Sequence, residues 1–186
     1  MPDISDRKVA ILSTHGFEQS ELETPLEELK KAGATVHVIA PDIGEIRGWD
    51  GGDWGQSVKV DKTLSSVDAA DYDALMLPGG QMNPDTLRAN KDAVEFVRAF
   101  WEAKKPIGAI CHAPWLLIEA DIINGRDVTS YHSIRKDVEN AGGRWQDSEV
   151  VCDKALVTSR NPDDLPAFCA KLIEEIAEGK HRSRAA

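Results

Sequence analysis

The chain has 186 residues, of which 41% are hydrophobic and 29% are charged. This length fits one domain whose core is large enough to fold without disulfides or metal. The 22 basic and 32 acidic residues give a formal net charge of −10, which argues against phosphate backbones and anionic lipid surfaces as partners. We therefore predict one domain over residues 1–186, with a short flexible C-terminal tail at about 179–186, and neither a nucleic-acid nor a membrane partner.

Short runs of apolar and β-branched residues alternate along the chain with segments of helical spacing. The runs predict buried strands at residues 9–12, 35–39, 74–77 and 107–110. The other segments predict helices at residues 20–33, 91–103, 115–125, 133–141 and 163–177. Ser20, with Glu23 three residues later, predicts a capping box at the start of the first helix. The glycine-rich residues 41–61 and residues 150–157 each predict a hairpin.

This alternation of strands and helices predicts a mostly parallel sheet covered on both faces. Right-handed crossovers then favour a flavodoxin-like three-layer α/β/α sandwich. Ligands bind such folds at the carboxyl ends of the strands. Three loops are expected to meet there, at residues 13–20, 78–86 and 111–114.

Cys111 directly follows one predicted strand, and the small residues Gly108, Ala109 and Ala113 lie close to it in the sequence. A sharp strand-to-helix turn of this kind is a nucleophile elbow, which exposes a reactive side chain. A thiol at a helix N-terminus also feels the positive end of the helix dipole, which favours the thiolate. The backbone N–H of His112 is then one candidate oxyanion donor. The alternative is that Cys111 is a small buried hydrophobic residue.

Two further features are expected near this elbow. His112 is either the base that activates the thiol or a residue that lends only its N–H, because neighbours on a helix do not face each other. Pro78-Gly79-Gly80 directly follows a strand. Gly79 or Gly80 is therefore a candidate for the second oxyanion donor, and an ordinary turn is the alternative.

Glu18, Glu21 and Glu23 crowd the first loop and the first helix. One of them, kept protonated by burial, can donate a hydrogen bond to a thiolate at position 111. The alternative is a solvated acidic turn that complements the helix dipole. Trp49 and Trp54 lie in the glycine-rich segment and form a substrate wall, a subunit contact or the packing of that loop.

The other cysteines have no such context. Cys152 and Cys169 are expected to pack in the core, since the odd count and the absence of a Cys-x-x-Cys spacing argue against disulfides and a zinc site. The remaining histidines of the predicted strands and loops are isolated, so no metal is expected: His15, His37 and His132. Reduced thiols and the lack of an apolar signal segment predict a cytoplasmic protein.

At these residues the sequence resembles the PfpI family, which belongs to the superfamily of the parkinsonism-associated deglycase and the class I glutamine amidotransferase fold. The likeness runs over nearly the whole chain, in family order, through residues 16–22, 72–80, 109–114 and 157–168. It implies Cys111 as the nucleophile, His112 as the catalytic histidine and Glu21 as the acid against the thiol. It also implies a carboxylate from a neighbouring subunit, for which Asp85 is the equivalent, and hence a homo-oligomer. It implies no cofactor.

Three functions follow from the residues and the resemblance. The first is a cofactor-free glyoxalase or deglycase in which Cys111 attacks small reactive carbonyls or glycated peptides. The second is an intracellular cysteine peptidase that uses Cys111, His112 and Asp85. The third is a redox sensor or holdase whose thiol oxidises stepwise. A class I amidotransferase is disfavoured because no downstream His-x-Glu is present.

Overall fold

A seven-stranded sheet forms the centre of the chain in a computed structural model, which describes residues 2–179. The strands lie in the order β11-β12-β8-β7-β1-β3-β6, and every neighbouring pair is parallel except β11 with β12. Their bounds are β1 Lys8–Leu12, β3 Thr35–Ala40, β6 Lys62–Thr63, β7 Ala74–Leu77, β8 Ile107–Ile110, β11 Val151–Asp153 and β12 Leu156–Ser159. Apart from Gly179, the predicted C-terminal tail lies outside the described residues.

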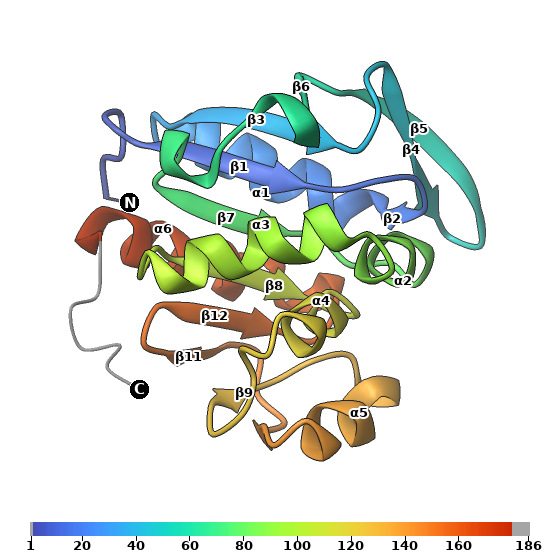
Figure 1. Cartoon of the computed structure of the whole chain (residues 1–186), viewed down its shortest axis with the longest axis vertical. Helices are drawn as coiled ribbons and strands as arrows, with labels where there is room; N and C mark the ends of the chain where they lie inside the picture. Colours follow the sequence, from blue (N-terminus) through green and yellow to red (C-terminus); the bar gives the residue numbers. More distant parts are fainter. Residues whose placement is uncertain (1, 180–186) are drawn as a thin grey trace.

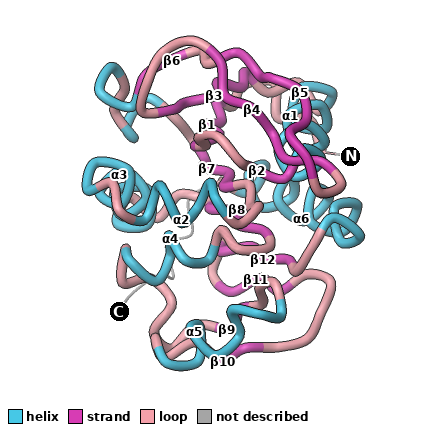
Figure 2. Tube along the Cα trace, turned by 90° about the vertical axis from the view of Figure 1, so that its right-hand side faces the viewer, coloured by secondary structure: helices cyan, strands magenta, loops and turns pink. Residues whose placement is uncertain are grey.

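Helices cover both faces of this sheet, and Figure 2 shows the strands edge-on between the two groups of helices. One face carries α1 (Gln19–Lys31) and α6 (Leu165–Glu178), and the other carries α3 (Lys91–Glu102) and α4 (Pro114–Glu119). The shorter helices α2 (Met82–Arg88) and α5 (Arg135–Asn140) extend the second group. The predicted flavodoxin-like three-layer sandwich is confirmed.

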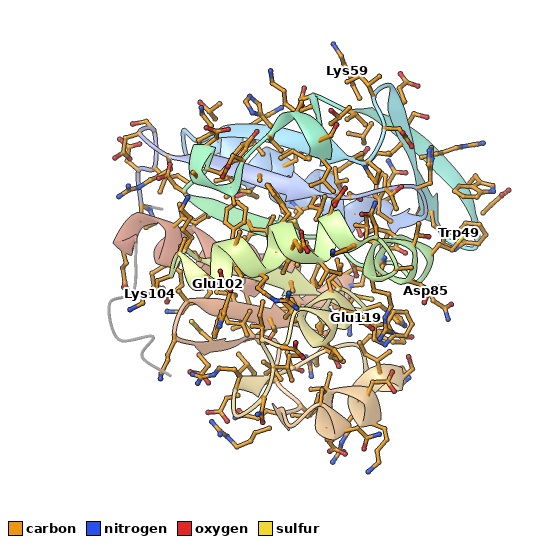
Figure 3. All side chains as sticks on the ribbon, viewed as in Figure 1. Trp49, Lys59, Asp85, Glu102, Lys104 and Glu119 are labelled. Carbon is orange, nitrogen blue, oxygen red and sulfur yellow. The ribbon has the colours of Figure 1, made fainter. Side chains whose placement is uncertain are left out.

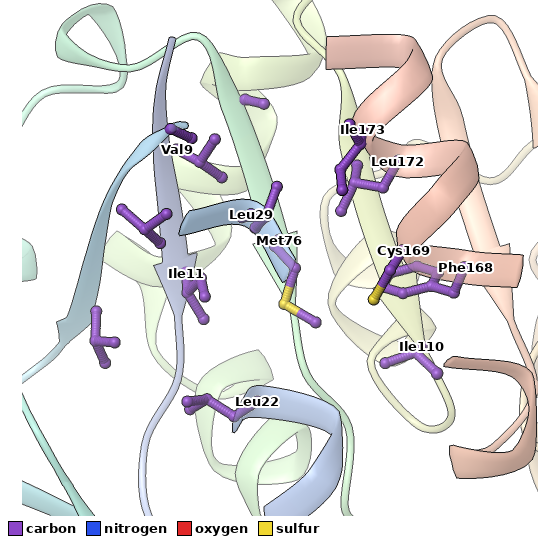
Figure 4. Packing of buried hydrophobic residues seen from close by; sticks show 14 of the residues in the cluster. Val9, Ile11, Leu22, Leu29, Met76, Ile110, Phe168, Cys169, Leu172 and Ile173 are labelled. Carbon is purple, nitrogen blue, oxygen red and sulfur yellow. The ribbon is translucent and has the colours of Figure 1, made fainter. Parts of the chain in front are cut away.

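Strand β1 shows how the sequence fills both layers. Its side chains alternate between the faces of the sheet because a strand has a period of two. Val9 and Ile11 pack with α1 and α6, whereas Ala10 and Leu12 pack on the side of α3. Figure 4 shows the first of these clusters, in which Cys169 of α6 lies among apolar side chains.

A hairpin extends beyond the carboxyl ends of the central strands (Figure 1). It consists of β4 (Glu45–Asp50) and β5 (Asp53–Lys59), and β2 (Phe17–Glu18) pairs with β4. This confirms the hairpin predicted in the glycine-rich segment. The remaining elements are short: β9 Asp127–Val128, β10 Arg144–Trp145, and the 3₁₀ turns η1 Leu64–Ser66, η2 Ala69–Asp71, η3 His132–Ile134 and η4 Pro162–Asp164.

Two local predictions are wrong. The capping box at Ser20 is absent, because α1 begins at Gln19 with Glu18 as its N-cap and no side-chain cap hydrogen bond. Glu23 instead accepts a hydrogen bond from the Gln19 amide, at 2.5 Å. The segment predicted as a loop at 78–86 contains the start of α2, because Pro84 lies in the first helical turn, where its missing N–H has no intrahelical partner to lose.

None of the helices that the structure describes has both the length and the apolar composition needed to cross a membrane.

Candidate active site

Cys111 occupies a strained turn between β8 and α4. Its φ is +65°, a left-handed conformation that is uncommon for a residue with a Cβ. Two backbone hydrogen bonds hold it there: its N–H donates to the carbonyl of Ser159 at 3.0 Å, and its carbonyl accepts from the N–H of Tyr131 at 2.8 Å. Such strain persists only where the surroundings enforce it, and it is concentrated at functional sites.

His112 faces the thiol even though the two residues are adjacent in sequence. Its Nδ1 lies 3.2 Å from the sulfur of Cys111, and its Nε2 lies 3.3 Å from Oγ of Ser133. The ring also stacks on Tyr131, with 4.7 Å between the ring centroids. The elbow makes this geometry possible, since Cys111 precedes α4 and is not helical.

The imidazole is neutral at physiological pH. Burial, assisted by the nearby His132, lowers the pKa of His112 to about 4. Both neutral tautomers are compatible with these contacts, because the hydroxyl of Ser133 can donate or accept. One of them carries its proton on Nε2 and donates it to Ser133. Nδ1 is then free to accept a proton from the thiol, which is the arrangement of an activated nucleophile.

Glu21 places a fully buried carboxyl group beside the same thiol. It lies in the first turn of α1, and its Oε2 accepts a hydrogen bond from the N–H of Gly79 at 3.0 Å. Its Oε1 is buried and has no partner within hydrogen-bond geometry among the described residues. Burial raises the pKa of Glu21 to about 8 despite the opposing effect of the Cys111 thiol. The side chain is therefore mostly protonated at neutral pH, which is the state predicted for a carboxyl group buried beside the thiol.

The pKa of Cys111 departs from the expectation drawn from the helix dipole. Burial, and then the charge of Glu21, raise the pKa of the Cys111 thiol above its usual value. Helix α4 begins only at Pro114 and has six residues, so its dipole is too weak to offset burial of the sulfur. The contribution from Glu21 disappears while that carboxyl keeps its proton. In the free protein the thiol consequently depends on a base to lose its proton.

In the Pro78-Gly79-Gly80 segment, the N–H groups of Gly79 and Gly80 differ in their partners. The N–H of Gly79 donates to Oε2 of Glu21, so Gly80 is the better placed of the two predicted donors to serve a group at the sulfur. The N–H of Gly80 interacts with both Cys111 and Glu21, and that of His112 also interacts with the sulfur. A Cβ at Gly79 would lie 2.6 Å from Cβ of Cys111, so only glycine allows this approach.

Asn83 ties this segment to the first loop, a role that the sequence did not suggest. Its side chain is fully buried on α2. The amide donates to the carbonyls of Pro78 and Gly79 at 2.9 and 3.2 Å, and its oxygen accepts the N–H of Thr14 at 2.8 Å. The loops after β1 and β7 are thus fixed to each other by one side chain.

Cys111 opens into a pocket of about 510 Å³, a size that suits a small ligand. The three predicted loops meet there, together with the hairpin and the segments after β9 and β12. The lining residues are Glu18, Glu21, Trp49, Gly51, Gly52, Gly80, Gln81, Cys111, His112, Tyr131, Ser133 and Pro162.

Some predicted residues lie outside this pocket. Asp85 is exposed on α2 and projects from the edge of the molecule (Figure 3). Trp54 is also exposed, packs edge-to-face on Trp49 and does not line the pocket, whereas Trp49 does. Sequence reasoning missed Tyr131 and Ser133, which follow a two-residue strand and carry no local signature. The one available signal is that both residues adjoin His132 in the sequence.

The other two cysteines lie in different surroundings. Cys152 interacts with the buried carboxyl group of Glu175, which pairs with Lys171 at 2.8 Å. Cys169 is buried in the core, as predicted, and Cys152 is half-buried at the edge strand β11 and packs against the same cluster. Among residues 2–179 no group of three or more His, Cys, Asp or Glu is arranged to hold a metal ion.

The fold and the site together define a flavodoxin-like α/β protein with a cysteine elbow at the carboxyl edge of its sheet. The sequence model of the DJ-1/PfpI family matches residues 7–175. The chain therefore belongs to the DJ-1/PfpI family, as the resemblance to PfpI predicted.

Individual relatives agree with this assignment. The chain is 48% identical over 163 residues to "Putative cysteine protease YraA" of Bacillus subtilis (strain 168), covering 87% of this chain and 94% of that one. It is 48% identical over 164 residues to "Protein/nucleic acid deglycase 2" of Escherichia coli (strain K12), covering 87% and 93%. These names support an enzyme of the DJ-1/PfpI family.

A solved structure shows the same fold. It is a two-domain protein from Anabaena variabilis with DJ-1/ThiJ/PfpI-like and ferritin-like domains, and it matches with a TM-score of 0.87 at 35% identity. The match covers 97% of this chain and 52% of that one, so this chain spans about half of its length.

Proposed function

We propose that the chain is a cofactor-independent, cysteine-dependent enzyme of stress response that hydrolyses reactive carbonyl compounds, in the manner of a glyoxalase or protein deglycase. The observation that carries this proposal is the 3.2 Å contact between the sulfur of Cys111 and Nδ1 of a neutral His112. A pocket of about 510 Å³ above the sulfur admits a small carbonyl compound. The relative named as a deglycase supports the same chemistry.

The reaction with methylglyoxal begins at the thiol. The sulfur attacks the aldehyde carbon while Nδ1 of His112 takes the thiol proton, and a hemithioacetal forms. A proton then moves from that carbon to the neighbouring carbonyl carbon through an enediol, which gives a thioester. Water cleaves the thioester to lactate and regenerates the thiol. The sum is methylglyoxal plus water giving lactate, so neither an oxidant nor a reductant is consumed.

The surrounding donors fit the charge that develops on oxygen. The N–H groups of Gly80 and His112 lie by the sulfur and can donate to the carbonyl oxygen as it becomes negative. Glu21, protonated at neutral pH, can move a proton to and from the enediol. Because both groups are fixed before the substrate arrives, little reorganisation is needed during the reaction.

Lactate release from methylglyoxal tests this proposal. We expect Cys111→Ala to lose more than about 10³-fold of the rate, because the nucleophile is gone, whereas Cys169→Ala should keep it. The assay is run without added thiols, since these form hemithioacetals on their own. Equal rates for the wild type and Cys111→Ala would reject the proposal.

A peptidase is the second candidate, and the name of the relative YraA favours it. In this proposal Asp85 completes the site of a neighbouring subunit in a homo-oligomer, because it is exposed and lies outside the pocket of its own chain. A fluorogenic peptide panel tests it with the same cysteine variants and with Asp85→Asn. Turnover that depends on both Cys111 and Asp85 in the assembled protein would favour the peptidase over the carbonyl enzyme.

A further inference from the structure

The pocket above Cys111 has an uneven distribution of charge. Two carboxyl side chains, Glu18 and Glu21, line it, and no lysine or arginine is present among the described residues that do so. Glu21 is mostly protonated at neutral pH. Glu18 is only half-buried and reaches solvent, so it supplies the formal negative charge of this pocket.

Glu18 forms no ion pair with any residue in the described part of the chain. Burial, and then the neighbouring acid Asp50, raise the pKa of Glu18, so Asp50 does not compensate for the charge of Glu18. The nearby Arg47 is engaged elsewhere, since its Nε donates to the carbonyl of Gly55 at 3.0 Å and its guanidinium lies over Trp54.

The imidazole beside the thiol does not supply a positive charge either, because His112 is neutral at physiological pH. Two aromatic side chains, Trp49 and Tyr131, line the same pocket. Aromatic faces attract cations and pack against neutral groups. A ligand that approaches the sulfur therefore meets one uncompensated carboxylate, aromatic surface and neutral hydrogen-bonding groups.

We propose that Glu18 makes this pocket select its carbonyl substrates by charge, so that it admits neutral and cationic compounds and rejects anionic ones. The substrate class is then neutral α-oxoaldehydes and carbonyl adducts of amino compounds that keep a positive charge, and not α-oxoacids. That these compounds are substrates rests on the proposed function. The selection itself is a property of access to Cys111 and can be measured without turnover.

Methanethiosulfonate reagents provide that measurement. Cys111 loses its proton and its sulfur attacks the divalent sulfur of the reagent. The S–SO2 bond breaks, a mixed disulfide forms and methanesulfinate leaves, so only the attached group differs between reagents. We compare an ethylammonium, a methyl and an ethylsulfonate reagent and follow the Cys111 peptide by mass spectrometry. We expect the cationic reagent to react on the order of tenfold faster than the anionic one, beyond their ratio with glutathione, because of the unscreened carboxylate.

Two variants sharpen the result. Glu18→Gln should bring the ratio of the cationic to the anionic rate close to the ratio measured with glutathione. Glu102→Gln, which removes an equal charge from the exposed end of α3, should leave the wild-type ratio unchanged. If Glu18→Gln does not fold, raising the ionic strength of the wild type from about 0.05 M to about 0.5 M should reduce the ratio, because salt shortens the range of the field.

The outcomes separate the two proposals. A wild-type ratio equal to that of glutathione, or a ratio unchanged by both Glu18→Gln and salt, would overturn the charge selection. A ratio that follows Glu18, in a protein that releases no lactate from methylglyoxal, would support the selection and remove the carbonyl hydrolase proposal alone.

Discussion

Cys111 and Cys169 show that burial does not distinguish a reactive cysteine from a structural one. Their exposed fractions are 6% and 5%, and burial raises the pKa of both thiols. What differs is the polar surroundings and the backbone. Cys111 has an imidazole nitrogen at 3.2 Å and a left-handed φ, whereas Cys169 lies within the regular helix α6 and packs against the apolar core. The base beside the sulfur, and not exposure, is the distinguishing feature.

Removing the imidazole of His112, the base beside Cys111, should have the largest effect on activity. We expect His112→Ala to lower the rate of lactate release by about 10²–10⁴-fold, the usual contribution of a positioned general base. His37→Ala is the matched control, because that histidine lies in β3 and contacts Tyr72, away from the pocket. A rate for His112→Ala within about twofold of the wild type would show that the thiol needs no help from His112, and the base would then not distinguish Cys111 from Cys169.

Replacing the buried acid should change how stability depends on pH. The pKa of Glu21 is raised from 4.5 to about 8 in the folded protein. The neutral carboxyl therefore stabilises the fold fully below about 4.5, and this stabilisation is lost as the pH rises to about 8. Relative to Glu21→Gln, the free energy of unfolding of the wild type should fall by up to about 1.4 kcal/mol per pH unit across that window.

Urea unfolding of both proteins at several pH values measures this difference. Taking the difference also cancels the opposite contribution of His112, whose lowered pKa makes the fold more stable as the pH rises from about 4 to about 6.5. The control Glu102→Gln keeps Glu21, so its curve should run parallel to that of the wild type. Parallel curves for the wild type and Glu21→Gln would mean that Glu21 is ionised in the folded protein.

The smallest effect is expected at the structural thiol. Cys169→Ala removes one buried sulfur from the cluster shown in Figure 4, which should lower the free energy of unfolding by about 1 kcal/mol. Lactate release should stay at the wild-type rate. A large loss of activity without a loss of stability would place Cys169 in the chemistry and would undo the comparison.

Much of the fold and the position of the candidate active site could be predicted from the sequence. The apolar runs identified the central strands, and the rule that ligands bind at their carboxyl ends correctly brought together the loops that carry Glu18, Gly80 and Cys111. Both predictions rest on the period of the pattern and on chain connectivity. These are local properties that one sequence displays.

The rest depends on tertiary contacts. Ser133 and Tyr131 reach the site from a segment after the two-residue strand β9, which has no periodicity to detect. The N–H of Gly79 binds Glu21 instead of facing the pocket because of how α1 packs. The pKa of Cys111 was predicted with the wrong sign, because the degree of burial at the elbow cannot be read from the neighbouring residues.

The left-handed backbone at Cys111 places the stability of the fold in conflict with the reactivity of the site. Glycine is the residue that suits this conformation best, so the substitution that most relaxes the turn also deletes the nucleophile. Selection for stability alone would favour Cys111→Gly, and the result would be a folded protein without its nucleophile. The cysteine at this position thus costs backbone strain and supplies a reactive sulfur.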